Sequence, residues 1–438
     1  MSRLRPLTEQ EIVDGIVATD GPVTLSGSHY SLGGQISYPD SLHLDMSGFN
    51  KVLKFDTELK LITVQSGITW QQIQSVIDPH NLSLKIMPDN IDYSVVGSLS
   101  VNAHSRFITE GPLINAVKSI RIIMADGKAY DASPDTNSTL FYGAIGGFGG
   151  LGVIVQATLE LVDNITLERR VKTLSYNEFN LHFNGSILGD EDIVLHQAIL
   201  YAPDFESLRD ISWRKTDKPV TDDRRLQPNR GEAWWRPMFT MWAASSVFIK
   251  RIQKNLIDPY IFSSEAVVRR NLETSYSLES SGFISSDSET MVMQEYLIPV
   301  KRFEIFVFNI RDIFSRYDAD VLKILVSYLP QDHAGLLAGS TAHVFSFKII
   351  YRQEKNEQSL KRVKEWTREL IRASMESNGS YNLPYHIDNL SSQFYRAYPA
   401  ADKFFEIKKK VDPSNRFKNL FWEQLHASIF VGPEHYVG

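Results

Sequence analysis

Residues 25–35 read LSGSHYSLGGQ, a strand end that runs into a loop of glycines and hydroxyl side chains. A backbone of this kind can hold a phosphate group through its N–H donors. Taken alone the stretch is weak evidence, because other tight turns after a strand have a similar composition. It acquires meaning only together with two further stretches of the chain.

The second stretch, residues 88–106, reads PDNIDYSVVGSLSVNAHSR. Its small residues, followed by Asn102, His104 and Arg106, predict a buried contact with a ligand. A lone histidine is more often a hydrogen-bonded structural residue, so both interpretations of His104 stay open.

The third stretch, residues 147–152, reads GFGGLG and literally matches the dinucleotide pattern G-x-G-x-x-G. That pattern requires a strand before it and a helix after it. Here the glycines follow a predicted helix at Ser138–Tyr142 and precede a predicted strand at Val153–Leu161. The sequence therefore disfavours a nicotinamide-binding Rossmann fold, although the glycines still let the backbone approach a bulky ligand.

In this order and spacing, the three stretches resemble the FAD-binding domain, of the PCMH type, found in the vanillyl-alcohol oxidase / p-cresol methylhydroxylase superfamily. Residues 409–417, KKVDPSNRF, resemble the family's closing segment K-x-x-D-P-x-x-x-F. The pattern is most similar to the decaprenylphosphoryl-β-D-ribose oxidases, with alditol and aldonolactone oxidases as more distant relatives. The resemblance implies FAD extended between two subdomains, its pyrophosphate on the first loop and its isoalloxazine facing a substrate domain.

The expected fold class is α+β, with a two-subdomain FAD-binding part and a substrate domain built on an antiparallel sheet flanked by helices. We predict an FAD-binding domain over residues 1–163, a substrate domain over 164–395, and a segment over 396–438 that returns to the FAD domain. Residues 203–232 are polar and rich in Asp, Arg and Pro, which predicts a surface loop.

The resemblance assigns flavin contacts to the three stretches and to the closing segment. The candidate residues are Gly27, Ser28, His29, Tyr30, Ser31, Gly34, Gln35, Pro88, Asp89, Asn90, Val96, Gly97, Ser98, Asn102, His104, Gly147, Gly149, Gly152, Val153 and Asn419. Some of them depart from the family pattern. Asp89 and Asn90 stand where Gly-Thr is usual, Val96 replaces the first glycine of a pair, and Ser105 replaces the glycine after His104.

Tyr30 occupies the position at which many relatives carry a histidine bonded covalently to the flavin. The decaprenylphosphoryl-β-D-ribose oxidases likewise have tyrosine there and hold FAD non-covalently. His29 is one residue off, and along a strand one residue turns the side chain to the opposite face. Dissociable FAD is therefore expected, with a covalent bond through His29 as the alternative.

Residues 293–299, MQEYLIP, resemble the family strand that crosses the substrate face of the flavin. Glu295 is a candidate to orient a hydroxyl or accept its proton, although an exposed position on an edge strand is the alternative. Tyr385 stands near where relatives place a lysine, and it is a further candidate to remove the hydroxyl proton. His386 is a candidate general base because its ordinary pKa lies near neutrality, and a loop cap is its alternative.

Composition argues against several other classes of function. The 438 residues carry a net charge of −6, so no overall positive field favours nucleic acid. Cysteine is absent, which excludes thiol catalysis and cysteine-ligated metal centres, and no cluster of other ligands predicts a metal site. No apolar run reaches 18 residues, and no signal-peptide core is found, so a cytoplasmic enzyme is expected. Peripheral membrane contact through Trp234–Arg251 is weighed against a lid or core role.

The sequence thus predicts an FAD-dependent oxidoreductase that oxidises a CH–OH group of a polar, sugar-like or polyol-like substrate by hydride transfer to the flavin N5. The expected electron acceptor is oxygen or a quinone. Two alternatives stay open: the oxidase component of an epimerase that acts on a lipid-linked sugar at the membrane surface, and a non-catalytic binding protein with a flavin-binding fold.

Overall fold

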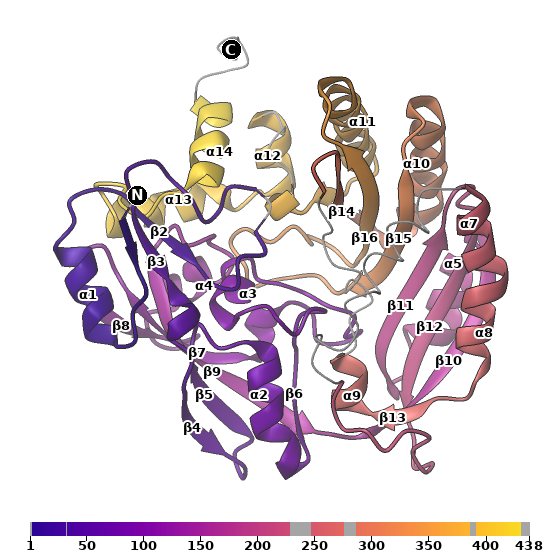
Figure 1. Cartoon of the computed structure of the whole chain (residues 1–438), viewed down its shortest axis with the longest axis horizontal. Coiled ribbons are helices and arrows are strands. Elements are labelled where there is room, and N and C mark those ends of the chain that lie inside the picture. The colour runs from indigo at the N-terminus through magenta and orange to yellow at the C-terminus, as the bar shows by residue number, and fades with distance from the viewer. Residues whose placement is uncertain (1, 32, 228–246, 276–285, 386–390, 431–438) are drawn as a thin grey trace.

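The structure, a computed structural model, describes residues 2–31, 33–227, 247–275, 286–385 and 391–430. Its described part contains three sheets in two halves that lie side by side (Figure 1). The fold class expected from the sequence, α+β with antiparallel sheets, is confirmed.

The N-terminal half contains two of the sheets. The smaller is parallel, in the order β1 (Ser2–Leu4), β3 (Leu42–Asp45), β2 (Val23–Ser26). The larger is antiparallel, and its strands are β4 (Val52–Asp56), β5 (Leu61–Gln65), β9 (Val153–Asp163), β7 (Val117–Ile123) and β8 (Ala129–Ala132), with β6 (Leu82–Leu84) paired to β9. The helices of this half are α1 (Glu9–Val17), α2 (Trp70–Ile77), α3 (Val95–Ser100) and α4 (Ser138–Ala144).

Local sequence explains where these helices begin. Thr69 and Gln72 form a reciprocal capping box at the start of α2, which satisfies two amides that the first helical turn leaves unpaired. Ser94 caps α3 by accepting a hydrogen bond from the amide of Gly97. The position of α3 matters for the site, because its cap serine contacts the loop that follows β2.

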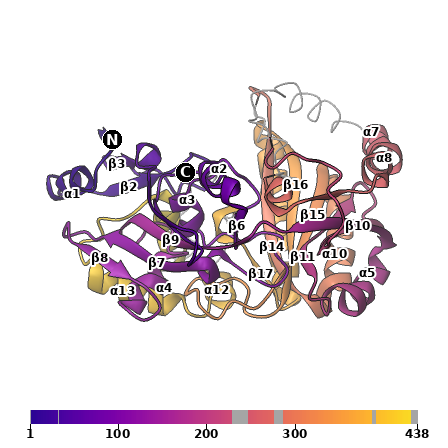
Figure 2. The same ribbon diagram turned by 90° about the horizontal axis from the view of Figure 1, so that it is seen from below.

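The second half is one eight-stranded sheet with helices on its outer face (Figures 1 and 2). Its order is β13 (Val267–Arg269), β10 (Thr166–Ser175), β12 (Ser207–Lys215), β11 (Ile193–Tyr201), β15 (Val321–Leu329), β16 (Val344–Glu354), β14 (Glu289–Pro299) and β17 (Ser380–Tyr381). Its helices are α5 (Tyr176–His182), α7 (Val247–Ile252), α8 (Asp258–Ser263), α9 (Arg270–Thr274), α10 (Phe303–Tyr317) and α11 (Glu357–Glu376).

Helix α10 shows why these helices cover the sheet. Its buried side chains recur every three or four residues, which places them on one face of a helix. They are Phe303, Phe306, Val307, Ile310, Ile313 and Phe314. Phe303 contacts Phe345 of β16 and Phe306 contacts Phe347, so the helix covers one face of the central strands and leaves the other face to the site.

The surface loop predicted for residues 203–232 is wrong in part, because Ser207–Lys215 is strand β12 inside the sheet. Its polar residues misled the prediction, since they are buried together with partners. Asp210 accepts hydrogen bonds from His196 and His182, and the Arg209 guanidinium lies over the ring of Tyr201. A buried polar side chain is tolerated when it is paired.

The C-terminal helices α12 (Ser391–Ala397), α13 (Ala401–Val411) and α14 (Leu420–Phe430) return to the N-terminal half, as both views show (Figures 1 and 2). Arg416 links the two chain ends. Its carbonyl accepts from the amide of Val23 at 2.8 Å, and its guanidinium donates to the carbonyls of Ala125 and Ile16, each at 2.6 Å.

Candidate active site

A cleft of about 130 Å³ lies where the N-terminal half meets the eight-stranded sheet. The cleft is lined by thirteen of the candidate residues: Gly27, Ser28, His29, Tyr30, Ser31, Gln35, Pro88, Asp89, Gly97, Ser98, His104, Glu295 and Tyr385. The structure therefore brings the first two glycine-containing stretches to the same cleft as Glu295 of β14. Its remaining lining residues are Tyr93, Ser94, Val101, Ala103, Lys348, Asn382 and Pro384.

The loop after β2 reaches the cleft because Gly27 has no side chain. A Cβ atom there would lie 1.9 Å from Ser94 Oγ and 3.3 Å from Val96 Cγ1. The loop backbone thus rests directly on the first turn of α3. Farther along, Gln35 Nε2 donates to the carbonyl of Pro384 at 3.0 Å, which ties the same loop to the C-terminal side of the cleft.

His29 and Tyr30 both line the cleft, so the argument that they face opposite sides is wrong. Strand β2 ends at Ser26, and His29 has a left-handed backbone with φ of 59°, so strand alternation does not apply. The ring of Tyr30 lies 4.9 Å from that of Tyr93. His29 Nε2 lies 3.5 Å from Ser26 Oγ.

A smaller cavity of about 60 Å³ continues from Gly27 toward the C-terminal segment. It is lined by Val96, Gly149 and Asn419 among the predicted contacts. Asn419 donates to the carbonyl of Phe148 at 3.1 Å and accepts from the amide of Trp422 at 2.9 Å. The closing segment is thereby fixed to the third glycine stretch.

Six predicted contacts line neither cavity, and the packing around them explains why their residue types occur there. Gly147 is constrained by packing, since a Cβ would lie 2.2 Å from the carbonyl of Gly143. Asn102 accepts from the amide of Ile114 at 3.0 Å and so holds its own loop. The six are Gly34, Asn90, Asn102, Gly147, Gly152 and Val153. His386, a candidate base, lies outside the described residues.

Sequence reasoning missed Lys348, the most consequential charge in the cleft. Its Nζ lies 2.9 Å from Asp89 Oδ2, and both side chains are at least nine-tenths buried. Burial would raise the pKa of Asp89, but the charges of Lys348 and Arg106 lower it. The one available signal was a lysine among the apolar residues of strand β16, which is costly unless paired.

Two departures from the family pattern compensate each other. Ser105 Oγ donates a hydrogen bond to Asp89. Ser105 replaces the family glycine after the histidine and Asp89 replaces the glycine of the Gly-Thr pair, so the two replacements bind each other. Arg106 lies 3.8 Å from Asp89 and 2.5 Å from Glu273 of α9. The departures therefore build one buried polar network instead of disturbing the loop.

Glu295 projects from β14 into the cleft, and its side chain is 1% exposed. It accepts hydrogen bonds from Ser346 Oγ, from Asn382 Nδ2 at 2.5 Å and from His104 Nε2 at 3.0 Å. Burial would raise its pKa, but His104, Lys348 and Ser346 hold it well below its usual range. Glu295 is thus an ionised carboxylate whose two oxygens are already engaged.

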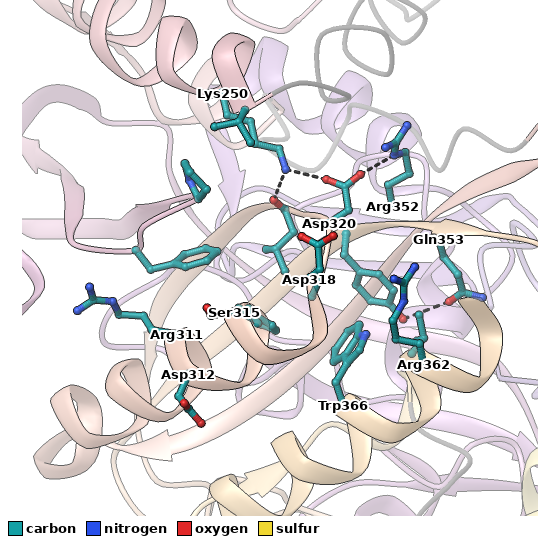
Figure 3. Close-up of a pocket in the computed structure, with 18 of the residues that line it drawn as sticks. Lys250, Arg311, Asp312, Ser315, Asp318, Asp320, Arg352, Gln353, Arg362 and Trp366 are labelled. Carbon is teal, nitrogen blue, oxygen red and sulfur yellow. Dashed lines mark hydrogen bonds and ion pairs between the residues drawn. The ribbon is translucent and has the colours of Figure 1, made fainter. Parts of the chain in front are cut away.

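A larger cavity, about 880 Å³, lies among α7, α10, α11 and the ends of β15 and β16 (Figure 3). No candidate catalytic or cofactor-binding residue lines this cavity. Figure 3 shows Lys250, Asp320 and Arg352 joined in a row, at 2.7 and 2.6 Å. Their charges satisfy one another, so we place the chemistry in the smaller cleft.

The described ranges hold no group of three or more His, Asp or Glu side chains placed to bind a metal ion. None of their helices combines the length and the apolar character that crossing a bilayer requires.

Residues 5–133 match the family model described as an FAD binding domain. L-gulonolactone oxidase of Bos taurus is 25% identical over 48% of this chain and 47% of its own. Alditol oxidase of a Streptomyces species is 28% identical over 36% and 38%, and decaprenylphosphoryl-beta-D-ribose oxidase of Mycolicibacterium smegmatis is 27% identical over 33% and 32%. The matched region is less than half of the length of each of these relatives.

Proposed function

The chain carries an FAD-binding domain of the vanillyl-alcohol oxidase / p-cresol methylhydroxylase superfamily, and from this premise we propose that it oxidises a CH–OH carbon of a polar, sugar-like or polyol-like substrate. The observation that carries the proposal is the cleft, in which the FAD-binding loops meet Glu295, Lys348 and Asn382 of the second half. A small polar substrate fits such a wall, because buried hydrogen-bonding groups orient hydroxyls and reject apolar analogues.

The cleft fits the cofactor on structural grounds. The loop backbone at Gly27 leaves a space that a Cβ would fill, and this loop borders both the cleft and the smaller cavity beside Gly149 and Asn419. We assign FAD to the loops at residues 27–35, 88–89 and 97–98 and to the smaller cavity beside Gly149 and Asn419. When bound, FAD supplies the hydride acceptor, while the protein supplies positioning and electrostatics.

The chain's own residues would position the substrate. Lys348, held by Asp89, presents a fixed cation, and Asn382, held by Glu295, presents an amide at the same wall. These groups are oriented before a ligand arrives, so binding costs little reorganisation. We assign the FAD-binding domain to residues 1–163, the substrate domain to 164–395 and the returning segment to 396–438.

The first experiment is an absorption spectrum of the purified protein before and after acid precipitation. Bands near ~370 and ~450 nm, with colour left in the supernatant, are expected for dissociable FAD. Colour held in the pellet would assign a covalent bond to His29 instead. A colourless protein that also takes up no added FAD would refute the whole proposal.

The second experiment identifies the substrate class. Under anaerobic conditions the FAD-loaded protein is mixed with L-gulono-1,4-lactone, D-arabinono-1,4-lactone and an alditol, and bleaching near 450 nm is followed. Bleaching by at least one of them is expected, followed by recovery of colour with oxygen or a quinone as the acceptor. If neither these compounds nor any other sugar bleaches the FAD-loaded protein, the result indicates the non-catalytic alternative.

A lipid-linked sugar substrate is the second candidate, and one surface favours it. Helix α7, the π-helical turn Gln253–Ile257 and helix α8 expose Phe248, Leu256 and Tyr260, which are 70%, 66% and 82% exposed, near the basic Arg251. Apolar and basic side chains on one helical surface suit an anionic lipid interface. Co-sedimentation with anionic vesicles, lost on Phe248→Ser, is expected if the substrate is membrane-borne. Residues 234–246 of the predicted contact, Trp234–Arg251, lie outside the described structure.

A further inference from the structure

His104 and Glu295 meet across the cleft from the two halves of the protein. His104 lies in the loop after α3, and Glu295 lies in the middle of β14. Their facing atoms, His104 Nε2 and Glu295 Oε1, are 3.0 Å apart. The two side chains are 9% and 1% exposed, so the contact is shielded from bulk water.

The carboxylate decides which ring nitrogen carries the proton. Because Glu295 is ionised, it can only accept a hydrogen bond, and so His104 Nε2 must be the donor. In a neutral imidazole the lone pair is then on Nδ1. That nitrogen is buried and has no hydrogen-bond partner in the described part of the chain, while His104 lines the cleft.

Such an atom points to a ligand. Buried polar atoms in proteins are nearly always hydrogen-bonded, and an exception calls for an explanation. A substrate hydroxyl in the cleft would satisfy Nδ1 by donating its proton to it. Glu295, in contrast, is a poor proton acceptor, because three donors already occupy its oxygens and its pKa is depressed.

We propose that His104 is the catalytic proton acceptor and that Glu295 is the positioning residue that orients it. The proposal rests on the proposed function and moves the role of base away from Glu295, Tyr385 and His386. The hydroxyl O–H bond breaks and its proton goes to Nδ1. The C–H bond breaks and its two electrons leave as hydride, for which FAD is the oxidant, and the carbon becomes a carbonyl.

Charged and titratable groups from both halves lie around the His104–Glu295 pair. Lys348 of β16 acts on Glu295, and Lys348 is itself paired with Asp89, which Arg106 also approaches. Tyr398 lies within electrostatic reach of Glu295, and Tyr30, His29 and Tyr385 line the same cleft. Of these groups, Glu295 contacts the ring directly, and its negative charge favours the imidazolium that proton transfer creates.

The kinetic test compares two variants with two matched controls. His104→Gln retains an amide that can reach Glu295 but has no base, and Glu295→Gln removes the charge with little change of shape. The controls are His80→Gln, an exposed histidine after α2, and Glu289→Gln, on the same strand β14 and paired with Arg352. FAD content and the rate of anaerobic bleaching by the best substrate are measured for each FAD-loaded protein from pH 5 to 9.

For the wild type and both controls, the bleaching rate is expected to rise with pH through one ionisation. His104→Gln should bind FAD within threefold of the wild type, lose about 10²- to 10⁴-fold in rate, and lose that ionisation. Glu295→Gln should keep the ionisation but move it to lower pH, because the imidazolium loses its counter-charge. If the His104→Gln protein keeps the ionisation, whatever its bleaching rate, the proposal is overturned, since a structural role leaves the pH profile in place.

A second measurement needs no turnover. The ¹⁵N-imidazole spectrum of FAD-loaded protein, with the His104 signals assigned by their loss in His104→Gln, reports which nitrogen carries hydrogen. A protonated Nε2 and a bare Nδ1 are expected above the ionisation, and the reverse tautomer would overturn the proposal. If no compound bleaches the wild type, the proposed function fails, while this spectrum still decides whether the histidine is set up as a base.

Discussion

Replacing Gly27 by alanine tests whether the loop after β2 is shaped for FAD. The new Cβ would lie 1.9 Å from Ser94 Oγ, 3.0 Å from Ser94 Cβ and 3.3 Å from Val96 Cγ1. Ordinary contact begins at 3.4 Å, so the loop or the cap of α3 must move by about 1.5 Å. Neither can move alone, because Ser94 is held by the amide of Gly97 and the loop continues from a paired strand.

The size of the effect follows from that overlap. Overpacking by one methyl group costs about 1–3 kcal/mol. If the loop must return to its original position to bind FAD, the same free energy is lost from binding. At about 1.4 kcal/mol per factor of ten, the dissociation constant for FAD should rise by roughly 5- to 150-fold. Thermal stability without FAD should fall much less, since the loop can then relax into the empty cleft.

The assay is titration of the FAD-free protein with FAD, followed by quenching of flavin fluorescence. Gly185→Ala is the matched control, because a Cβ there meets nothing within 4 Å. The double variant Gly27→Ala/Ser94→Ala removes the closest clashing atom and should regain part of the affinity. If Gly27→Ala binds FAD within twofold of Gly185→Ala, this loop does not form the cofactor cradle and the reasoning fails.

Three further predictions concern stability. Lys348→Met should lower the free energy of unfolding by about 3–5 kcal/mol, because it strands a buried carboxylate, and Asp89→Asn/Lys348→Met should recover most of it in urea titrations. Burial would raise the pKa of Asp45, but hydrogen bonds from Ser47 and Arg3 lower it to about 2, so its stabilisation is present above pH 3.8 and lost as pH falls from there toward 2. Asp45→Asn should remove up to roughly 2 kcal/mol of that acid dependence, and an unchanged acid melting profile would contradict the assignment. Asn419→Ala should cost about 1–3 kcal/mol and weaken FAD binding, whereas loss of stability with full FAD affinity would separate the closing segment from the site.

Much of the architecture follows from local patterns. The hairpin of β4 and β5, the buried face of α10 and the end of α13 before Pro413 are encoded by periodicity and by turn residues that act over a few positions. Strand β12 was missed because its pattern is polar, and its polar side chains are explained only by partners from other elements. Local composition cannot distinguish a polar strand buried in a sheet from a polar loop.

The site divides in the same way. The loops at Gly27 and Gly97 could be placed from a family pattern, because glycine at such positions is a local requirement of the backbone. The role of Glu295 could not be read from its own strand, since it depends on His104, which lies 191 positions earlier, and on Asn382. Lys348 was missed for the same reason, because its partner Asp89 is 259 positions away.

Three buried contacts between charged or titratable groups join the two halves of the protein at the cleft: His104 with Glu295, Asp89 with Lys348, and Arg106 with Glu273. Each pairs a residue from residues 88–106 with one beyond residue 164. These side chains therefore also hold the halves together, and a substitution in the Asp89–Lys348 or the Arg106–Glu273 pair should alter cofactor affinity and stability at once. Activity loss alone cannot identify a catalytic group here, because a shifted cleft wall would produce the same loss. A measurement that reports on a single proton, such as the pH profile of the rate or the tautomer of His104, distinguishes a catalytic role from a structural role at this interface.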